Sequence, residues 1–208
     1  MGRIREVADA LWSGSPSTDG LQPVSLILGL EEMQPGLAFV SSFGNVIAFR
    51  SSEGMALIDT GGFFMAGQTH ATLREWCDAP LSTAIYTHGH VDHAFGVPPF
   101  EAEGRGRVEV IAHEAVKDRF DRYQLTAGYN RVINGRQFGV AAWPAEYRYP
   151  DRTYRDRLDL QVGGEALELH HARGETDDHT WVWLPQRKVL CTGDLFIWAS
   201  PNCGNPQK

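Results

Sequence analysis

The chain has 208 residues, of which 42% are hydrophobic and 22% are charged; this composition predicts a globular domain with a buried core and excludes a disordered chain. Its 19 basic and 26 acidic residues give a formal charge of −7, which argues against nucleic-acid binding through overall charge. Three cysteines form no CxxC pair and indicate a reducing compartment rather than a disulfide framework: Cys77, Cys191 and Cys203.

No segment has the pattern of a targeting signal or a membrane span. The uncharged stretch at residues 34–49 is interrupted by proline and glycine and is too short to cross a bilayer. We therefore expect a cytoplasmic protein with no membrane partner, or a periplasmic one whose signal peptide has been removed.

Short apolar runs separated by turn residues predict the strands of a sheet. In chain order, the predicted strands are residues 24–30, 37–43, 46–49, 55–58, 83–87, 108–112, 167–169, 181–184 and 189–191. Gly44-Asn45 is the predicted hairpin turn after the second of them, and helical spacing predicts helices at 65–77 and from Glu114 onward. Hairpins followed by strands that alternate with helices predict a mixed α/β sandwich, in one domain over residues 1–208.

Residues 119–157 differ in composition from the rest of the chain. They contain five of the six tyrosines, Trp143, and eight arginines against four acidic residues. This cationic aromatic segment therefore carries a charge of +4, which leaves −11 on the remainder. Such a segment between strands is either a functional lid or a solvated extension whose tyrosines pack locally, and composition alone does not decide between them.

The strongest functional signal is the HxHxDH motif at residues 88–93, directly after a predicted strand. Its four potential ligands, His88, His90, Asp92 and His93, cannot all be buried without partners, because each would lose its hydration. Imidazole suits zinc, iron and similar ions, and an aspartate adds a charged oxygen ligand. The motif therefore predicts a metal site in the loop at the end of the strand.

At this point the sequence resembles the metallo-β-lactamase superfamily. The resemblance rests on the early hairpins, the turn at Asp59-Thr60-Gly61, the HxHxDH loop and the strand end that leads to Asp194. It implies an αββα sandwich, an α/β (α+β) fold, with one or two metal ions at the edge of the sheets.

The resemblance also implies a ligand set. His88 and His90 would bind a first ion, and Asp92 and His93 a second. Asp194 would be the carboxylate that bridges them. Asp59 would be the acidic residue that orients the ligands from behind, a role that metal centres commonly require. Zinc is the expected metal, with iron or manganese as alternatives.

One ligand position departs from the common pattern of the family. Most members have a histidine in a Gly-His-Thr turn upstream of the bridging aspartate, whereas this chain has Glu175 there. A carboxylate at that position resembles the alkylsulfatase-like branch of the superfamily. His171 and His179 are alternatives for the same ligand, because the sequence does not show the geometry of the loop.

The expected reaction is hydrolysis of an ester-like bond by an activated water, with Asp92 or Asp194 handling the proton. Glu175 and the cationic aromatic segment together favour a small anionic ester, such as an alkyl sulfate, because arginine pairs with sulfate oxygens in a fork geometry. The candidate substrate-binding residues are Arg131, Arg148, Arg173 and His179.

Other functions use the same residue pattern. The main alternative is a thioester or lactone hydrolase of the hydroxyacylglutathione hydrolase type. A phosphodiesterase and an iron-dependent sulfur oxygenase are further enzymatic alternatives, although the net charge disfavours nucleic-acid substrates. A non-catalytic binding module with an incomplete metal site is the alternative outside the enzymes.

The superfamily has one more metal-binding histidine, well after the bridging aspartate. Only 14 residues follow Asp194, and none of them is histidine. We therefore expect a domain truncated at its C-terminus, a site completed by another chain in a homo-oligomer, or an enzyme with one metal ion.

Overall fold

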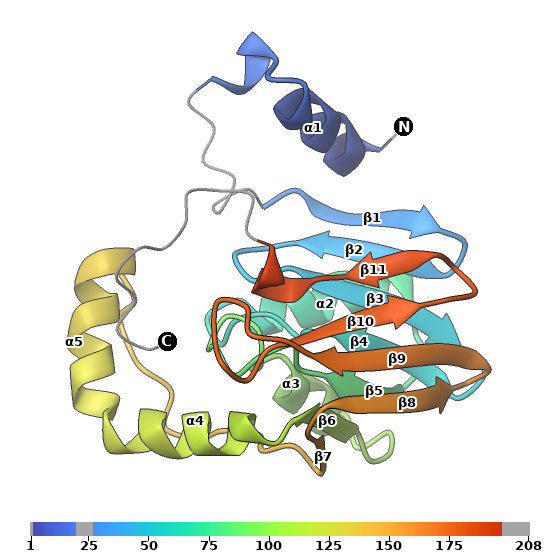
Figure 1. Ribbon diagram of the computed structural model, residues 1–208. Coiled ribbons are helices and arrows are strands. Elements are labelled where there is room, and N and C mark those ends of the chain that lie inside the picture. Colours follow the sequence, from blue (N-terminus) through green and yellow to red (C-terminus); the bar gives the residue numbers. More distant parts are fainter. Residues whose placement is uncertain (1, 20–26, 197–208) are drawn as a thin grey trace.

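The alternation of apolar residues along the strands builds two facing β-sheets (Figure 1). The structure is a computed structural model that describes residues 2–19 and 27–196. Within these residues, one sheet has seven strands in the order β1 (Gly29–Gln34), β2 (Leu37–Ser41), β3 (Val46–Ser51), β4 (Gly54–Ile58), β5 (Leu81–Ile85), β6 (Glu109–His113) and β7 (Arg152–Tyr154). The facing sheet has the order β11 (Val189–Cys191), β10 (Thr180–Leu184), β9 (Glu165–His171) and β8 (Arg157–Val162).

The first four strands form an antiparallel meander, and β4 to β7 then run parallel to one another. The helices are α1 (Arg3–Trp12), α2 (Ala66–Trp76), α3 (Val97–Glu101), α4 (Ala115–Leu125) and α5 (Ala127–Phe138), with short 3-10 turns η1 (Pro16–Thr18) and η3 (Gly193–Leu195). Figure 1 shows α2 and α3 behind the seven-stranded sheet, on the side away from the four-stranded sheet. This arrangement confirms the predicted α/β sandwich.

The core has two layers, because successive side chains of a strand point to opposite faces. In β4, Met55 and Leu57 pack toward the helices, whereas Ala56 and Ile58 pack between the two sheets. All five residues of β4 are buried. A strand covered on both faces has a continuous apolar run, and residues 55–58 form such a run in the sequence.

The predicted elements differ from the structure mainly at their ends and in the elements that were missed. Of the strand predicted at residues 24–30, residues 24–26 lie outside the described residues, and the strand itself begins at Gly29. The composition arguments missed α1, α3, α5, β7 and β8. In α3, two prolines stand at the start of the helix, where the missing N–H groups have no helical partner in any case.

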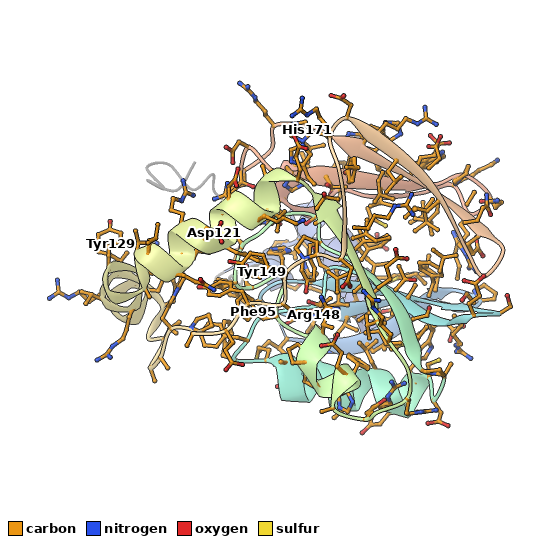
Figure 2. The ribbon with its side chains drawn as sticks, turned by 90° about the horizontal axis from the view of Figure 1, so that it is seen from below. Phe95, Asp121, Tyr129, Arg148, Tyr149 and His171 are labelled. Carbon is orange, nitrogen blue, oxygen red and sulfur yellow. The ribbon has the colours of Figure 1, made fainter. Side chains whose placement is uncertain are left out.

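The cationic aromatic segment contributes more to the core than to a lid. Tyr123 is buried, and the Tyr147 ring lies 5.1 Å from those of both Phe95 and Phe120. Figure 2 shows Tyr129 on α5, at the far end of the segment from Arg148 and Tyr149. Tyr129 and Phe138, both on α5, are exposed. Local packing therefore accounts for most of these aromatic residues.

None of the helices in the described part of the chain has the length and apolar character needed to cross a membrane.

Asp151 attaches the end of this segment to the seven-stranded sheet. Its carboxylate accepts hydrogen bonds from the backbone N–H of Val110 at 2.9 Å, from Arg148 at 2.8 Å and from Arg107 at 3.0 Å. Burial raises the pKa of this carboxyl, but the hydrogen bonds from Arg148, Val110 and Arg107 outweigh it and lower the pKa to about 2. The ionised carboxylate is thus bound more strongly in the folded chain than in the unfolded one.

We expect Asp151→Asn to lower the free energy of unfolding at pH 7 by about 1–2 kcal/mol, because it removes a carboxylate whose pKa is depressed by folding. A depressed pKa stabilises the fold above the unfolded value of 3.8, and that stabilisation is lost as the pH falls toward about 2. Denaturant unfolding at pH 7 and at pH 3 measures the difference between variant and parent. The difference in the free energy of unfolding should be smaller at pH 3 than at pH 7. An equal difference at both pH values would contradict the expectation.

A matched control is Asp159→Asn, which breaks the ion pair between Asp159 and Arg157. The side chain of Asp159 is 64% exposed and that of Arg157 is 53% exposed. Exposed pairs contribute little, so this variant should change stability by less than about 0.5 kcal/mol.

Candidate metal centre

The histidine loop lies at the carboxyl end of β5, the edge of a parallel sheet where α/β proteins place their sites. It is tied to the turn after β4 by backbone hydrogen bonds, including Thr60 N–H to His93 O at 2.7 Å. His88 and His93 are buried, with relative exposures of 0% and 4%. Gly44, in the β2–β3 hairpin, packs against the same loop, and a Cβ there would overlap the carbonyl oxygen of Asp92. Glycine is therefore required at that point of the hairpin.

A first cluster of potential ligands joins His88, His90 and Glu175, whose ligand atoms lie within 4.8 Å of one another. Glu175 comes from the loop that connects β9 to β10. Its Oε2 lies 2.9 Å from His90 Nδ1 and 3.7 Å from His88 Nε2. The loop therefore brings a carboxylate from the second sheet to two imidazoles from the first.

A second cluster joins His88, His93 and Asp194 within the same limit. Asp194 lies in η3, directly after β11, and its Oδ1 is 3.6 Å from His93 Nε2. Asp92 lies beside this cluster, with Oδ2 3.3 Å from the same nitrogen. His88 belongs to both clusters, so the two candidate ion positions adjoin.

Asp59 holds the second cluster from behind. Its carboxylate accepts hydrogen bonds from the backbone N–H of Thr87 at 2.7 Å, from the Thr87 hydroxyl at 2.8 Å and from His93 Nδ1 at 2.8 Å. The last contact turns Nε2 of His93 toward Asp92 and Asp194. Asp59 itself has a left-handed backbone, with φ at 56°, which aspartate tolerates better than most residues. The role that the resemblance implied for Asp59 stays a proposal, and this geometry supports it.

The protonation states of Glu175, Asp92 and His88 suit a metal ion, whereas three neighbouring carboxylates outweigh burial and raise the pKa of His93 well above its usual range. Burial raises the pKa of Glu175, but the neighbouring imidazoles of His88 and His90 outweigh it and hold the pKa far below its usual range. The same balance, through His93, lowers the pKa of Asp92. Burial also lowers the pKa of His88, which keeps the ring neutral. Ionised carboxylates and neutral imidazoles are the forms that bind metals.

The donors pass a test of fit for a divalent cation. Nε2 of His88 and Nε2 of His90 are buried, and neither has a hydrogen-bond partner. Unpaired polar atoms in a protein interior are costly, and a metal ion is a partner that removes this cost. A set of nitrogen and carboxylate donors fits zinc, iron or manganese.

Each of the two histidines that were alternatives to Glu175 has one ring nitrogen bound to a backbone carbonyl, although the Nδ1 of His179 is buried without a hydrogen-bond partner and its ring stacks on that of His88, with centroids 5.0 Å apart. His171 Nδ1 donates to the carbonyl of His179 at 2.9 Å, and the His171 ring stacks on His113 with centroids 3.9 Å apart. His179 Nε2 donates to the carbonyl of Thr192 at 2.9 Å. Burial lowers the pKa of His179 to about 4, so its ring is neutral. The geometry favours Glu175 as the ligand and gives His179 a part in holding the turn before Asp194.

The structure brings none of the three candidate substrate-binding arginines into either cluster. Arg131, on α5, and Arg173, after β9, are exposed. The guanidinium of Arg148 is engaged by the protein itself: it donates to Glu101 at 2.8 Å and to Asp151 at 2.8 Å, and to two backbone carbonyls. A substrate role for the three arginines stays a prediction.

Sequence reasoning missed two buried residues that lie against the histidine loop, Arg119 on α4 and Asp178 in the loop after Glu175. The available signal was weak. Asp178 stands three residues after a candidate ligand, and Arg119 was one of eight arginines in the cationic aromatic segment.

Two facing sheets with helices outside, and a histidine–carboxylate cluster at their edge, define a metallohydrolase of the αββα class. Residues 41–201 match the family model described as the metallo-beta-lactamase superfamily, so the chain belongs to that superfamily. The match confirms the resemblance and the fold class predicted from the sequence.

Alkylsulfatases are among its relatives, which supports the alkylsulfatase-like branch. A linear primary-alkylsulfatase of Pseudomonas sp. is 27% identical over 166 residues, covering 69% of this chain and 31% of that protein. The stereoselective inverting sec-alkylsulfatase Pisa1, also from Pseudomonas sp., is 25% identical with a TM-score of 0.64, over 78% of this chain and 30% of that one. The chain thus spans about a third of the length of these relatives.

A metallo-beta-lactamase from Cronobacter sakazakii shares the fold alone. It is 19% identical with a TM-score of 0.60, and the match covers 80% of this chain and 61% of that protein.

We expect Glu175→Gln to weaken Zn²⁺ binding by about tenfold or more, because it removes the carboxylate charge that faces His88 and His90. His171→Gln is the matched control and should leave the affinity unchanged, since His171 contacts a backbone carbonyl and His113. Competition with a chromophoric chelator measures both. Unchanged affinity in Glu175→Gln combined with weaker binding in His171→Gln would move the ligand role to the histidine.

Proposed function

We propose that this metallo-beta-lactamase superfamily hydrolase cleaves a small anionic ester, with an alkyl sulfate as the favoured substrate. The observation that carries the proposal is the Glu175 carboxylate, which faces both His88 and His90 in the first ligand cluster. The alkylsulfatase relatives support it, since both the sequence and the structural comparison find proteins of that name.

In this proposal, His88, His90, His93, Asp92, Glu175 and Asp194 are the residues that hold one or two divalent ions, with zinc favoured over iron and manganese. Bound there, such ions would supply Lewis-acid chemistry, which activates water and polarises an ester oxygen. The side chains of this chain would position the water and the ligands, as described next.

Asp92 and Asp194 are the ligand-cluster carboxylates nearest to solvent, with side chains 19% and 29% exposed, whereas Asp59 is only 3% exposed. Neighbouring His93 outweighs burial and holds the pKa of each below its usual range. Both are therefore ionised near neutral pH and can accept a hydrogen bond from an attacking water. Asp59 keeps His93 in place during this step by accepting a hydrogen bond from its Nδ1–H.

A groove leads to the second ligand cluster and suits a substrate with an apolar part. Its volume is about 610 Å³, and one end is formed by Asp59, His93 and Asp194. The apolar part of its wall consists of Leu37, Ala38, Phe39, Phe43, Ile47, Val189, Leu190 and Phe196. Arg5 also lines it, with its guanidinium hydrogen-bonded to the carbonyl of Met33 and paired with Glu31 at 3.5 Å. An alkyl chain fits such a wall because burying apolar surface is favourable.

We expect purified, metal-loaded protein to release sulfate from alkyl sulfates, with kcat/KM rising from butyl to dodecyl sulfate as more apolar surface is buried. Thioesters and lactones tested in parallel should be poorer substrates. Asp194→Asn should abolish sulfate release, and the exposed control Asp159→Asn should not alter it. Hydrolysis of thioesters or lactones without sulfate release would overturn the proposal in favour of the hydroxyacylglutathione hydrolase type. A protein that binds metal but hydrolyses none of these compounds would favour a binding module.

A further inference from the structure

A second buried carboxylate, Asp178, lies behind the first ligand cluster. Its exposure is 0%. It accepts hydrogen bonds from the backbone N–H of Gly89 at 3.0 Å, from Arg119 Nε at 2.9 Å and from the hydroxyl of Thr176. The contacts with Gly89 and Arg119 join parts of the chain that are far apart in sequence, 89 and 59 residues from Asp178.

These contacts touch the chain next to every ligand of the first cluster. Gly89 stands between His88 and His90, and Thr176 directly follows Glu175. Through Gly89, Asp178 holds the backbone between the two imidazoles. Through Thr176, it holds the loop that carries the Glu175 carboxylate. Asp59 performs the corresponding task for His93 in the second cluster.

Arg119 supplies the positive charge that balances Asp178 in the interior. Its side chain is 2% exposed, and it also contacts Asp177 Oδ1 at 2.5 Å and the buried side chain of Tyr123. Gly89 packs directly on this pair: a Cβ there would lie 2.9 Å from Arg119 Cδ and 3.0 Å from Asp178 Oδ2. A side chain at residue 89 would push the histidine loop away from the pair.

Arg119 differs from the other arginines of the cationic aromatic segment. Arg148 is half-buried and bound to Glu101 and Asp151. The remaining six are exposed: Arg122, Arg131, Arg136, Arg152, Arg155 and Arg157. Arg119 is the arginine through which this segment contacts the histidine loop from behind.

We propose that Arg119 and Asp178 are positioning residues of the first ligand cluster, which hold His88, His90 and Glu175 at the spacing required by a divalent ion. Both act through the backbone of the loops and contact neither the ion nor a substrate. Removing one partner leaves an unbalanced charge in the interior, so the loops must move to hydrate it. The ligand spacing, and with it the metal affinity, then changes. The proposal rests on the proposed metal centre but is independent of the ester that is cleaved.

The test uses Co²⁺ as a probe, because its visible spectrum reports the geometry of its ligands directly. The variants are Asp178→Asn, Arg119→Gln and the double variant, in the full chain. We expect each single variant to bind Co²⁺ about 10- to 100-fold more weakly, as for other residues that orient metal ligands, and to shift the visible bands. The double variant should be no weaker than the poorer single variant, since the two residues act as a unit.

Arg148→Gln is the matched control, because it also removes an arginine bound to two carboxylates in the same segment. It should lower the melting temperature while leaving the Co²⁺ spectrum and affinity unchanged. Circular dichroism checks that each variant is folded. Where Arg119→Gln does not fold, Arg119→Lys decides, because it keeps the charge but loses the two-pronged contact.

Folded Asp178→Asn or Arg119→Lys protein with the parent spectrum and affinity would overturn the proposal, and so would parent protein that does not bind Co²⁺. Effects of the same size in Arg148→Gln would reduce the pair to a general contribution to stability and would likewise overturn it. Parent protein that binds Co²⁺ but releases no sulfate would contradict only the proposed substrate.

Discussion

Burial of three imidazoles in one space is the constraint on which the rest of the site depends. His88, His90 and His93 lie at the end of β5, and two of their ring nitrogens have no hydrogen-bond partner. Buried imidazoles with unpaired nitrogens are stable only where a carboxylate or a metal ion compensates for their lost hydration. The carboxylates that face the rings, Glu175 and Asp194, come from the other sheet. The candidate ligands therefore meet only because the two sheets face each other with the loops that carry them at the same edge.

Two further carboxylates make this arrangement rigid. Asp59 binds the Thr87 backbone and His93, and Asp178 binds the Gly89 backbone and Arg119. Each connects a loop that carries ligands to another part of the chain. A site that must hold several donors at fixed separations requires such support, because a loop without it would relax toward water.

Composition left two roles open for the cationic aromatic segment, a functional lid and an extension that packs locally. In the structure, Tyr123 and Tyr147 pack against the core and Arg148 binds Glu101 and Asp151. Amphipathic side chains are equally suited to cover a sheet edge, since the ring is buried while its polar end finds a partner. The connection of this segment to the metal centre runs through the buried side chain of Arg119.

The sequence by itself determined what depends on local spacing. The HxHxDH loop places four potential ligands within reach of one another whatever surrounds it, and the apolar runs specify most strands of the two sheets. The tertiary structure decided every relation between distant loops. Only the packing of β9 and β10 against the first sheet turns Glu175, rather than His171 or His179, toward His88 and His90. Only the position of α4 gives Arg119 its contact with Asp178, across 59 residues of chain. The physical reason is that local periodicity sets which face a residue occupies, whereas the partner that it meets on that face is set by how whole layers pack.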